Sequence, residues 1–342
     1  MGNYTHNSSA SSADASPRLK PIDTKSDASN DDVDSGYSSA ASSTMGLPAV
    51  TFTPYHLKWL NDRLETMEAR DILRFCKVLF PNLYQSTAFG LTGLVTLDML
   101  SKLEQEDSRS VDIIFLDTLY HFKETLDLVQ RVQDRYSSTK VHIFKPDGCN
   151  TVADFEAIFG ERTWETSAEM YDWYAKVEPQ QRAYTELNVA AVFTGRRRSQ
   201  GGQRDKIPIV EIDEERGVVK INPLVNWSFD QVHRYIKEHD VPYNALLDQG
   251  YKSVGDWHST SPVAAGEDER AGRWKGQAKT ECGIHNQKSR YALYLEEMEQ
   301  KKREEAMAKA FQHNQERINC NNSSKVDAAT SSSSAQPVQV SS

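Results

Sequence analysis

The sequence has few cysteines and no cysteine pairs. Its four cysteines are Cys76, Cys149, Cys282 and Cys320, and no two of them are close enough to form a Cys-x-x-Cys motif. Four cysteines are too few for a disulfide scaffold in a chain of 342 residues, and structural zinc or iron–sulfur sites usually take their ligands from closely spaced pairs. Cys282 and His285 could supply two zinc ligands, but no second pair is evident. We therefore expect neither a disulfide framework nor a bound metal.

The sequence also lacks long apolar runs and an excess of basic charge. No stretch approaches the roughly 18 consecutive apolar residues of a membrane-spanning helix, and the N-terminus has neither an apolar signal core nor the acid-poor composition of a transit peptide. The sixth residue is His6 rather than Ser or Thr, so the myristoylation pattern that begins with Met-Gly fails. The net charge of −9 disfavours a general nucleic-acid binder. These absences predict a soluble, cytoplasmic protein with no membrane or nucleic-acid partner.

Both ends of the chain are poor in large apolar residues. Residues 1–46 include twelve serines and six aspartates, and the stretch from about His313 is similarly polar. Such segments cannot bury enough apolar surface to offset the entropy lost on ordering, so we predict disordered tails at 1–46 and 313–342. The ordered part divides into a nucleotide-binding α/β domain at 47–265 and a C-terminal segment with a helix at 266–312.

Helical and strand patterns alternate between the two tails. Thr53 and Pro54 form an N-cap and first-turn pair, and the apolar residues that follow recur at helical spacing, with Cys76 on the apolar face and therefore in the core. Short apolar runs then predict four strands, at 82–89, 111–118, 141–146 and 188–195. Strands that alternate with helices predict an α/β fold in which a parallel sheet has helices on both faces. In such sheets ligands bind at the carboxyl ends of the strands, near the switch in strand order.

Three segments that directly follow these strands carry side chains suited to an anionic ligand. The first opens a helix with hydroxyl and small residues, whose free N–H groups can receive an anion, although Ser, Thr and Gly also serve as ordinary caps. In the second, an Asp could accept hydrogen bonds from a ribose or a base, or simply cap the next helix. The third has four arginines and two adjacent glycines, and guanidinium groups match phosphate and sulfate oxygens, so an anion site is favoured over a solvated basic face. The candidate substrate-binding residues are Ser86, Thr87, Phe89 and Gly90 in the first segment, Asp117 and Thr118 in the second, and Arg197, Arg198, Gln200 and Arg204 in the third.

The stretch RWKGQAKTECGIH, residues 273–285, places Cys282 among basic groups. Nearby cations favour the thiolate, which is the nucleophilic form of cysteine. The alternative is a small buried cysteine near a solvated run of charge. The basic residues around Cys282 are Arg270, Arg273, Lys275, Lys279 and His285.

Four stretches together resemble one enzyme family. KVEPQQRAYTEL, TGRRRSQGGQR, PYNALLDQGYKSVGDWHS and KTECGIH, in this order, resemble the thioredoxin-dependent phosphoadenylyl-sulfate reductases, most closely those of fungi. The resemblance implies an adenine-nucleotide alpha-hydrolase-like (Rossmann-like) domain that binds 3′-phosphoadenylyl sulfate (PAPS). It implies reduction to sulfite and adenosine 3′,5′-bisphosphate in sulfate assimilation towards cysteine and methionine, with thioredoxin, or glutaredoxin, as reductant and a homodimeric enzyme.

The resemblance also implies roles for particular residues. Cys282 would take the sulfonate as an S-sulfonate, with His285 beside it as a second catalytic residue. The arginine loop would hold the leaving bisphosphate, and Arg270, Arg273 and Lys275 would contact the substrate. No cysteine neighbours Cys282, so an outside thiol must release sulfite. Glycines between Gly266 and Gly283 would let this segment move as a lid.

The sequence departs from two related groups. ATP pyrophosphatases of the wider superfamily have a Ser-Gly-Gly-x-Asp-Ser loop, whereas STAFGL stands here without the paired glycines or the Asp, which disfavours ATP cleavage. Adenylyl-sulfate reductases hold an iron–sulfur cluster with two cysteine pairs, whereas AAVFTGRRR and VGDWHST here contain no cysteine. We therefore expect no cluster and a 3′-phosphorylated substrate. The alternatives are a cluster-free adenylyl-sulfate reductase and a non-catalytic nucleotide-binding regulatory protein.

Overall fold

The structure, a computed structural model, describes residues 52–277, 279, 281–285 and 290–330. Within these ranges, the side chains of residues 285, 290 and 312–330 are not described. The tail predicted at 1–46 lies outside the described residues.

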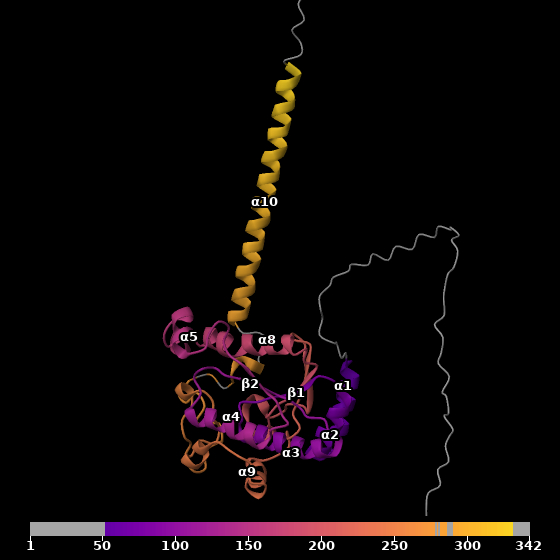
Figure 1. Ribbon diagram of the computed structural model, residues 1–342, viewed down its shortest axis with the longest axis vertical. Coiled ribbons are helices and arrows are strands. Elements are labelled where there is room, and N and C mark those ends of the chain that lie inside the picture. The colour runs from indigo at the N-terminus through magenta and orange to yellow at the C-terminus, as the bar shows by residue number, and fades with distance from the viewer. Residues whose placement is uncertain (1–51, 278, 280, 286–289, 331–342) are drawn as a thin grey trace, which may run out of the picture. The chain divides into compact units, whose positions relative to one another are not determined.

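The centre of the fold is a six-stranded, mostly parallel sheet (Figure 1). The strands follow the order β3-β2-β1-β4-β6-β5, in which only the edge strand β5 is antiparallel to its neighbour. Their bounds are β1 Leu83–Ser86, β2 Ile113–Leu116, β3 Val141–Phe144, β4 Ala191–Phe193, β5 Val210–Asp213 and β6 Val218–Ile221. The four strands predicted from the sequence are confirmed as β1 to β4.

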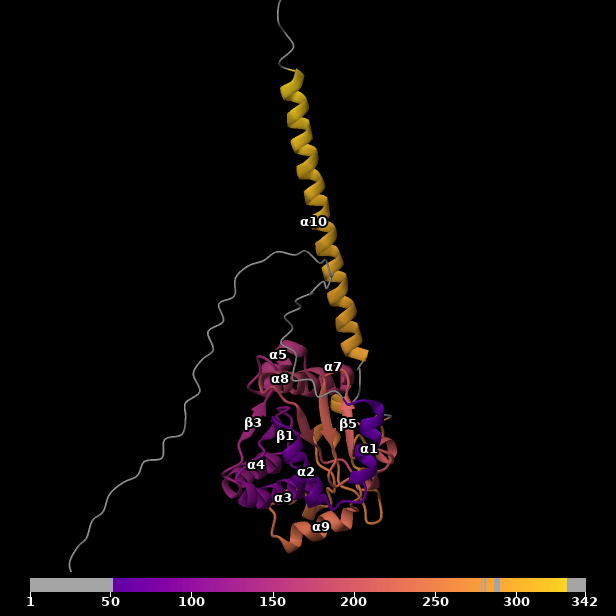
Figure 2. The ribbon, with the colours of Figure 1, turned by 90° about the vertical axis from the view of Figure 1, so that its right-hand side faces the viewer.

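Helices cover both faces of the sheet. Alternate residues of β2 point to opposite faces: Ile113 and Phe115 pack into the larger core, whereas Ile114 and Leu116 pack into a second cluster against α8. Figure 2 shows α8 on one side of the strands and α3 and α9 on the other. Strands buried on both faces are typical of α/β proteins, so the predicted fold class is confirmed. The helices of the larger core are α1 Pro54–Leu64, α2 Ala69–Leu79, α3 Leu91–Asp107, α4 Lys123–Arg135 and α9 Phe229–Glu238, and the other face carries α8 Glu178–Glu186.

The first helix begins where the sequence predicts. Pro54 is the first residue of α1, and the Thr53 hydroxyl accepts a hydrogen bond from the backbone N–H of His56 at 3.2 Å. Cys76 lies on α2 and is fully buried in the larger core, and this burial raises the pKa of its thiol to about 12. This cysteine is therefore part of the core, as predicted.

Shorter helices connect β3 to β4, and one long helix follows Cys282. The connecting helices are α5 Val152–Phe159, α6 Thr163–Thr166, α7 Ala168–Asp172 and the π-helix η1 Trp173–Val177, which leads into α8. The long helix, α10 Arg290–Thr330, continues past His313, where we predicted a disordered tail to begin. Extending an existing helix costs far less than nucleating one, so polar residues can continue it.

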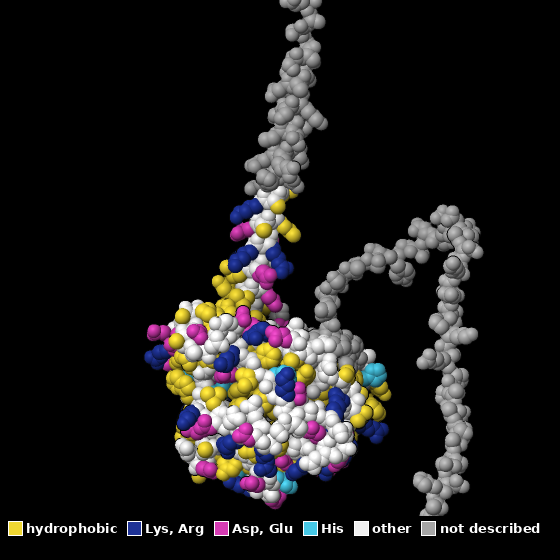
Figure 3. Space-filling model, in the orientation of Figure 1, with side chains coloured by type: hydrophobic (Ala, Val, Ile, Leu, Met, Phe, Trp, Pro, Cys, Tyr) yellow, Lys and Arg dark blue, Asp and Glu magenta, His cyan; other side chains and the backbone are white. Residues whose placement is uncertain are grey.

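The surface of the molecule carries charges of both signs. On the face shown in Figure 3, basic and acidic side chains are interspersed. No helix in the described part of the chain is long and apolar enough to cross a membrane.

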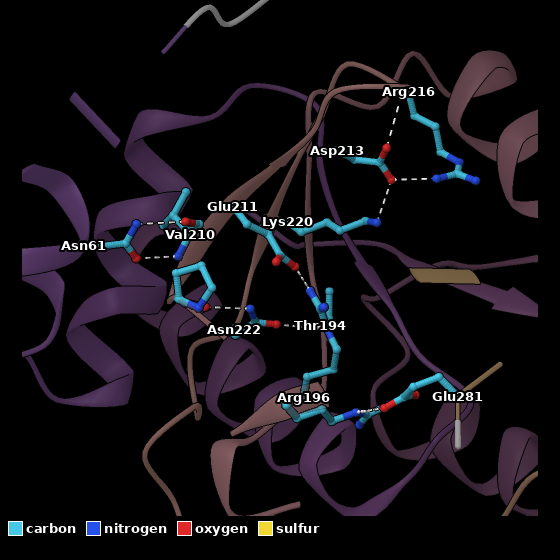
Figure 4. A network of polar contacts seen from close by, with 12 residues as sticks. Asn61, Thr194, Arg196, Val210, Glu211, Asp213, Arg216, Lys220, Asn222 and Glu281 are labelled. Carbon is cyan, nitrogen blue, oxygen red and sulfur yellow. Dashed lines mark hydrogen bonds and ion pairs between the residues drawn. The ribbon is translucent and has the colours of Figure 1, made fainter. Parts of the chain in front are cut away.

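The hairpin of β5 and β6 was not predicted from the sequence. Its strands carry buried charges: the Lys220 ammonium lies 2.6 Å from the Asp213 carboxylate, which also pairs with Arg216 at 2.8 Å (Figure 4). These charges obscure the apolar pattern by which strands are recognised. The turn closes with a 2.7 Å hydrogen bond from the N–H of Gly217 to the backbone carbonyl of Asp213. Gly217 has a φ of 65°, a conformation that favours glycine.

The strand order places a switch point between β1 and β4. From β1 the chain continues outwards to β2 and β3, then returns to place β4 on the other side of β1. The loops that leave the carboxyl ends of β1 and β4 therefore diverge, and the crevice between them is the expected ligand site of an open α/β sheet.

Candidate active site

A cavity of about 240 Å³ lies at this switch point. Its walls come from the segments after β1, β2 and β4, from η1, and from residues 244–284 in the C-terminal part of the chain. The sequence-predicted residues that line it are Ser86, Thr87, Phe89, Gly90, Thr118, Arg197, Gln200, Arg204, Arg270, Arg273 and Cys282. The tertiary fold thus brings Cys282 to the same cavity as all three post-strand segments.

The other predicted site residues do not line the cavity. Asp117 accepts a hydrogen bond from the N–H of Leu119 at 3.0 Å and so caps its own loop. The guanidinium of Arg198 pairs with Glu65 on the far side of the loop. Lys275 is exposed. The backbone of His285 belongs to a 3₁₀ turn, but its side chain lies outside the described residues.

The segment after β1 presents the start of a helix to the cavity. Gly90 is the N-cap of α3. The first backbone hydrogen bond of this helix runs from the N–H of Leu94 to the Gly90 carbonyl at 3.0 Å. The N–H groups before it have no partner within the helix and can receive an anion. Thr87 accepts a hydrogen bond from the N–H of Phe89 at 2.9 Å, and only a glycine fits at Gly93, because a Cβ there would overlap the Thr87 side chain.

Two arginines of the loop after β4 pair with carboxylates of the C-terminal segment. Arg197, with 2% of its surface exposed, donates from Nη2 to both oxygens of Glu269 at 2.8 and 2.6 Å, and from Nε to Thr92 at 2.9 Å. Arg204 binds Glu281 through two hydrogen bonds of 2.6 and 2.7 Å. These bidentate pairs join the arginine loop to the residues that precede Cys282.

Among the described residues, four cations interact electrostatically with Cys282. Arg270, Arg273 and Lys279 come from its own segment, as the sequence predicts. The fourth, Lys176, comes from η1 and was not singled out from the sequence. The available signal was that Lys176 opens the KVEP stretch on which the family resemblance rests, but nothing local distinguishes it from a surface lysine. Positive charge around Cys282 thus comes from two separate parts of the chain.

Lys176 is buried within a network of charges. Its ammonium lies 2.8 Å from Asp256 and 3.1 Å from Asp172, and Asp256 also accepts a hydrogen bond from Thr118 at 2.6 Å. Burial alone would lower the pKa of Lys176, but Asp256 and Asp172 outweigh burial and raise it. Burial would likewise raise the pKa of Asp256, but Lys176 and His121 hold it well below its usual range. Both groups are therefore charged at neutral pH.

Arg273 is a half-buried cation that lines the cavity and has no ion-pair partner among the described residues. Within the described part of the chain, no Asp or Glu oxygen lies within 4 Å of its guanidinium, which donates to the Val254 carbonyl at 3.3 Å and lies 4.5 Å from the ring centroid of Trp274. A Cβ at Gly255 would overlap the guanidinium, so a larger residue there would displace Arg273 from its present position. Burial lowers the pKa of Arg273. A desolvated guanidinium of this kind is well suited to bind an anion.

The glycines of the C-terminal segment differ in their surroundings. Gly266 and Gly276 have φ values of 86° and 81° and open space around them. A Cβ at Gly272, in contrast, would overlap the Ser261 carbonyl, and the neighbouring Trp274 is buried. Gly272 is thus a site of close packing, whereas Gly266 and Gly276 have the conformations that favour glycine. Movement of this segment as a lid stays a prediction.

Among the described residues, no three His, Cys, Asp or Glu side chains are grouped as a metal site requires. This statement does not extend to the side chain of His285, one of the two residues considered above as zinc ligands.

Comparison with known proteins gives one consistent family. Residues 82–262 match the phosphoadenosine phosphosulfate reductase domain. The chain is 58% identical over 293 residues to a phosphoadenosine phosphosulfate reductase of Emericella nidulans, covering 86% of this chain and 95% of the relative. It is 52% identical over 252 residues to the Saccharomyces cerevisiae phosphoadenosine phosphosulfate reductase, covering 72% and 96% of the two chains.

A solved structure gives the same result. The crystal structure of a phosphoadenylyl-sulfate reductase from Candida auris, in complex with phosphate, is similar to this structure with a TM-score of 0.57 and 49% identity. The alignment covers 62% of this chain and all of that one.

Proposed function

Because the chain belongs to the phosphoadenosine phosphosulfate reductase family, and is therefore an oxidoreductase that reduces PAPS in sulfate assimilation, we propose that Cys282 is its nucleophile and thioredoxin its reductant. The observation that supports this proposal is the position of Cys282 at the switch-point cavity, beside Arg273, whose guanidinium has no ion-pair partner in the described part of the chain. A nucleophile, an anion-binding helix start and cations meet there, as attack on a phosphosulfate requires.

In the first step, the Cys282 thiolate attacks the sulfur atom of PAPS. A sulfur–sulfur bond forms, and the bond between the sulfur and the bridging phosphate oxygen breaks. Adenosine 3′,5′-bisphosphate leaves with the electron pair of that bond, and Cys282 carries an S-sulfonate. The reaction brings an anion towards an anion, so Arg273 and Lys176 would offset the charge that builds up on the leaving oxygens.

In the second step, sulfite is released by a thiol from outside the chain. Of the other cysteines whose side chains the structure describes, Cys76 lies on α2 in the larger core, and Cys149 lies in a separate aromatic cluster with Phe155 and Tyr171. Neither lines the cavity, so neither can reach the sulfonated Cys282 as placed here. One thioredoxin thiolate would displace sulfite by forming a disulfide with Cys282, and the second thioredoxin thiol would then restore the Cys282 thiol, leaving oxidised thioredoxin.

Three further features belong to this proposal. The enzyme works without an iron–sulfur cluster, it is a homodimer, and it acts in the cytoplasm. The first is supported by the absence of cysteine pairs from the sequence, and the other two by family resemblance.

The experiment is to incubate the protein with PAPS in the absence of reductant and to analyse it by mass spectrometry. We expect one sulfonate, located on Cys282 and removed by reduced thioredoxin with release of sulfite. Cys282→Ser should bind adenosine 3′,5′-bisphosphate nearly as the parent does but release no sulfite, whereas Cys149→Ser, the matched control, should retain turnover. Turnover by Cys282→Ser with thioredoxin in excess would reject the assignment.

A further inference from the structure

Glu269 and Asp256 are carboxylates on the wall of a cavity whose other charged lining residues are cationic; Asp256 is paired with Lys176, whereas Glu269 is paired with Arg197. Both Glu269 and its partner Arg197 line the cavity, and Glu269 is 8% exposed. A carboxylate in this position repels an entering phosphate and occupies a guanidinium that could bind it. Such a residue weakens substrate binding unless it performs another task.

Arg197 is held in place without Glu269. Its Nε donates to Thr92 at 2.9 Å, and its Nη1 donates to Ser199 at 2.6 Å and to the Trp227 carbonyl at 3.1 Å. Only Nη2 faces Glu269. Loss of Glu269 would therefore leave the guanidinium in position, with Nη2 free to donate to another acceptor.

A second carboxylate keeps the C-terminal segment attached by a different contact. Glu281, directly before Cys282, pairs with Arg204 and also with Arg270 at 3.2 Å. Glu281 itself does not line the cavity. The segment thus has one ion pair in which both partners line the cavity, Glu269 with Arg197, and one in which only the arginines line it and Glu281 is held by two of them.

We propose that Glu269 is a positioning residue that holds the Cys282 segment on Arg197 before the nucleotide binds, and that an anionic oxygen of the nucleotide then takes over Arg197 Nη2. Glu281 keeps its pairs during this exchange. The inference rests on the proposed function for the identity of the nucleotide and for the role of Cys282.

The exchange makes nucleotide affinity and turnover depend on Glu269 in opposite directions. Without its charge, the nucleotide no longer competes for Arg197 and binds more tightly. Without Glu269 to recapture Arg197, the bisphosphate product also leaves more slowly, and slow product release reduces turnover. A residue with a merely structural role would not increase affinity when it is replaced.

The test compares Glu269→Gln with Glu65→Gln in the full-length protein. Glu65 is the matched control, because it pairs with Arg198 of the same loop but lines no part of the cavity. Calorimetry should show that Glu269→Gln binds adenosine 3′,5′-bisphosphate about tenfold more tightly or better, the contribution of a charge-assisted hydrogen bond. Its kcat for sulfite release should fall by about tenfold, because the more tightly bound product leaves more slowly, while Glu65→Gln should change neither quantity.

Bisphosphate affinity that is unchanged or weaker in Glu269→Gln would overturn the proposal, whatever happens to turnover. If that variant does not fold, Glu269→Asp retains the charge but shortens the side chain, and a gain in affinity of roughly threefold is expected from the weakened pair; no gain would equally reject the exchange. Repeating the calorimetry in the Cys282→Ser background separates the two ideas, because affinity there does not depend on the nucleophile.

Discussion

Replacement of Arg273 by methionine should reduce activity strongly while leaving stability almost unchanged. Arg273 is half-buried on the cavity wall, and no carboxylate among the described residues lies close enough to form an ion pair with it. Methionine has a similar length and no charge, so it fills the same space without the cost of a desolvated cation.

The magnitudes follow from the contacts. The variant loses the hydrogen bond from Nη1 to the Val254 carbonyl, worth about 1 kcal/mol, and the cation–π contact with Trp274, worth up to about 2 kcal/mol. It gains relief from burying an unpaired charge, which costs several kcal/mol. These contributions nearly cancel. Loss of a charge-assisted contact to the phosphosulfate costs about 1.5–3 kcal/mol, or roughly 10–150-fold in kcat/KM.

The assay is sulfite release from PAPS with thioredoxin in excess, together with thermal unfolding. Arg216→Met is the matched control, because Arg216 is also half-buried but pairs with Asp213 on the β5–β6 hairpin, away from the cavity. It should show the opposite pattern: a loss of about 1.5–3 kcal/mol in stability, since Asp213 loses a charge-assisted hydrogen bond but keeps Lys220, with unchanged kcat per folded molecule. An Arg273→Met protein that is severely destabilised, yet fully active where folded, would refute the reasoning.

Three other predictions can be checked directly. Arg197→Ala should weaken bisphosphate binding by about 1.5–3 kcal/mol. Arg198→Ala should alter binding little, although the sequence alone predicts the same role for both arginines, because the Arg198 guanidinium pairs with Glu65. Equal losses of affinity in calorimetry would contradict the placement of the two side chains. Elemental analysis of the purified protein should find no stoichiometric iron or zinc; about one metal per chain would refute the cluster-free assignment. Burial lowers the pKa of His258 from 6.5 to about 4. Between these two pH values the unfolded chain binds a proton at His258 that the folded chain does not, so the stability of the fold should fall as the pH decreases from 6.5 to about 4. Over this pH range His258→Gln should show a smaller decrease in melting temperature than the parent, and an identical decrease would argue against a buried neutral histidine.

Local patterns were sufficient for most of the fold. The apolar runs at β1 to β4 and the helical spacing around Cys76 are patterns among neighbouring residues. The side chains that these patterns predict to be buried, Cys76 among them, lie in the core. The β5–β6 hairpin was missed because Lys220 and Asp213 are charged residues in a buried strand pair. Their charges are satisfied across the hairpin, and a pattern taken along one strand does not contain that information.

The sequence by itself determined the chemistry of this protein: a lone cysteine among cations, an arginine-rich loop after a strand, and no cysteine pairs. Only the tertiary structure decided which of these groups work together. Arg197 and Arg198 are adjacent in the chain, yet one lines the cavity and the other pairs with Glu65 outside it. Lys176 lines the cavity and is paired there with Asp256, a residue far away in sequence. The physical reason is that burial and charge pairing depend on distance in space, which the strand order sets and local sequence does not.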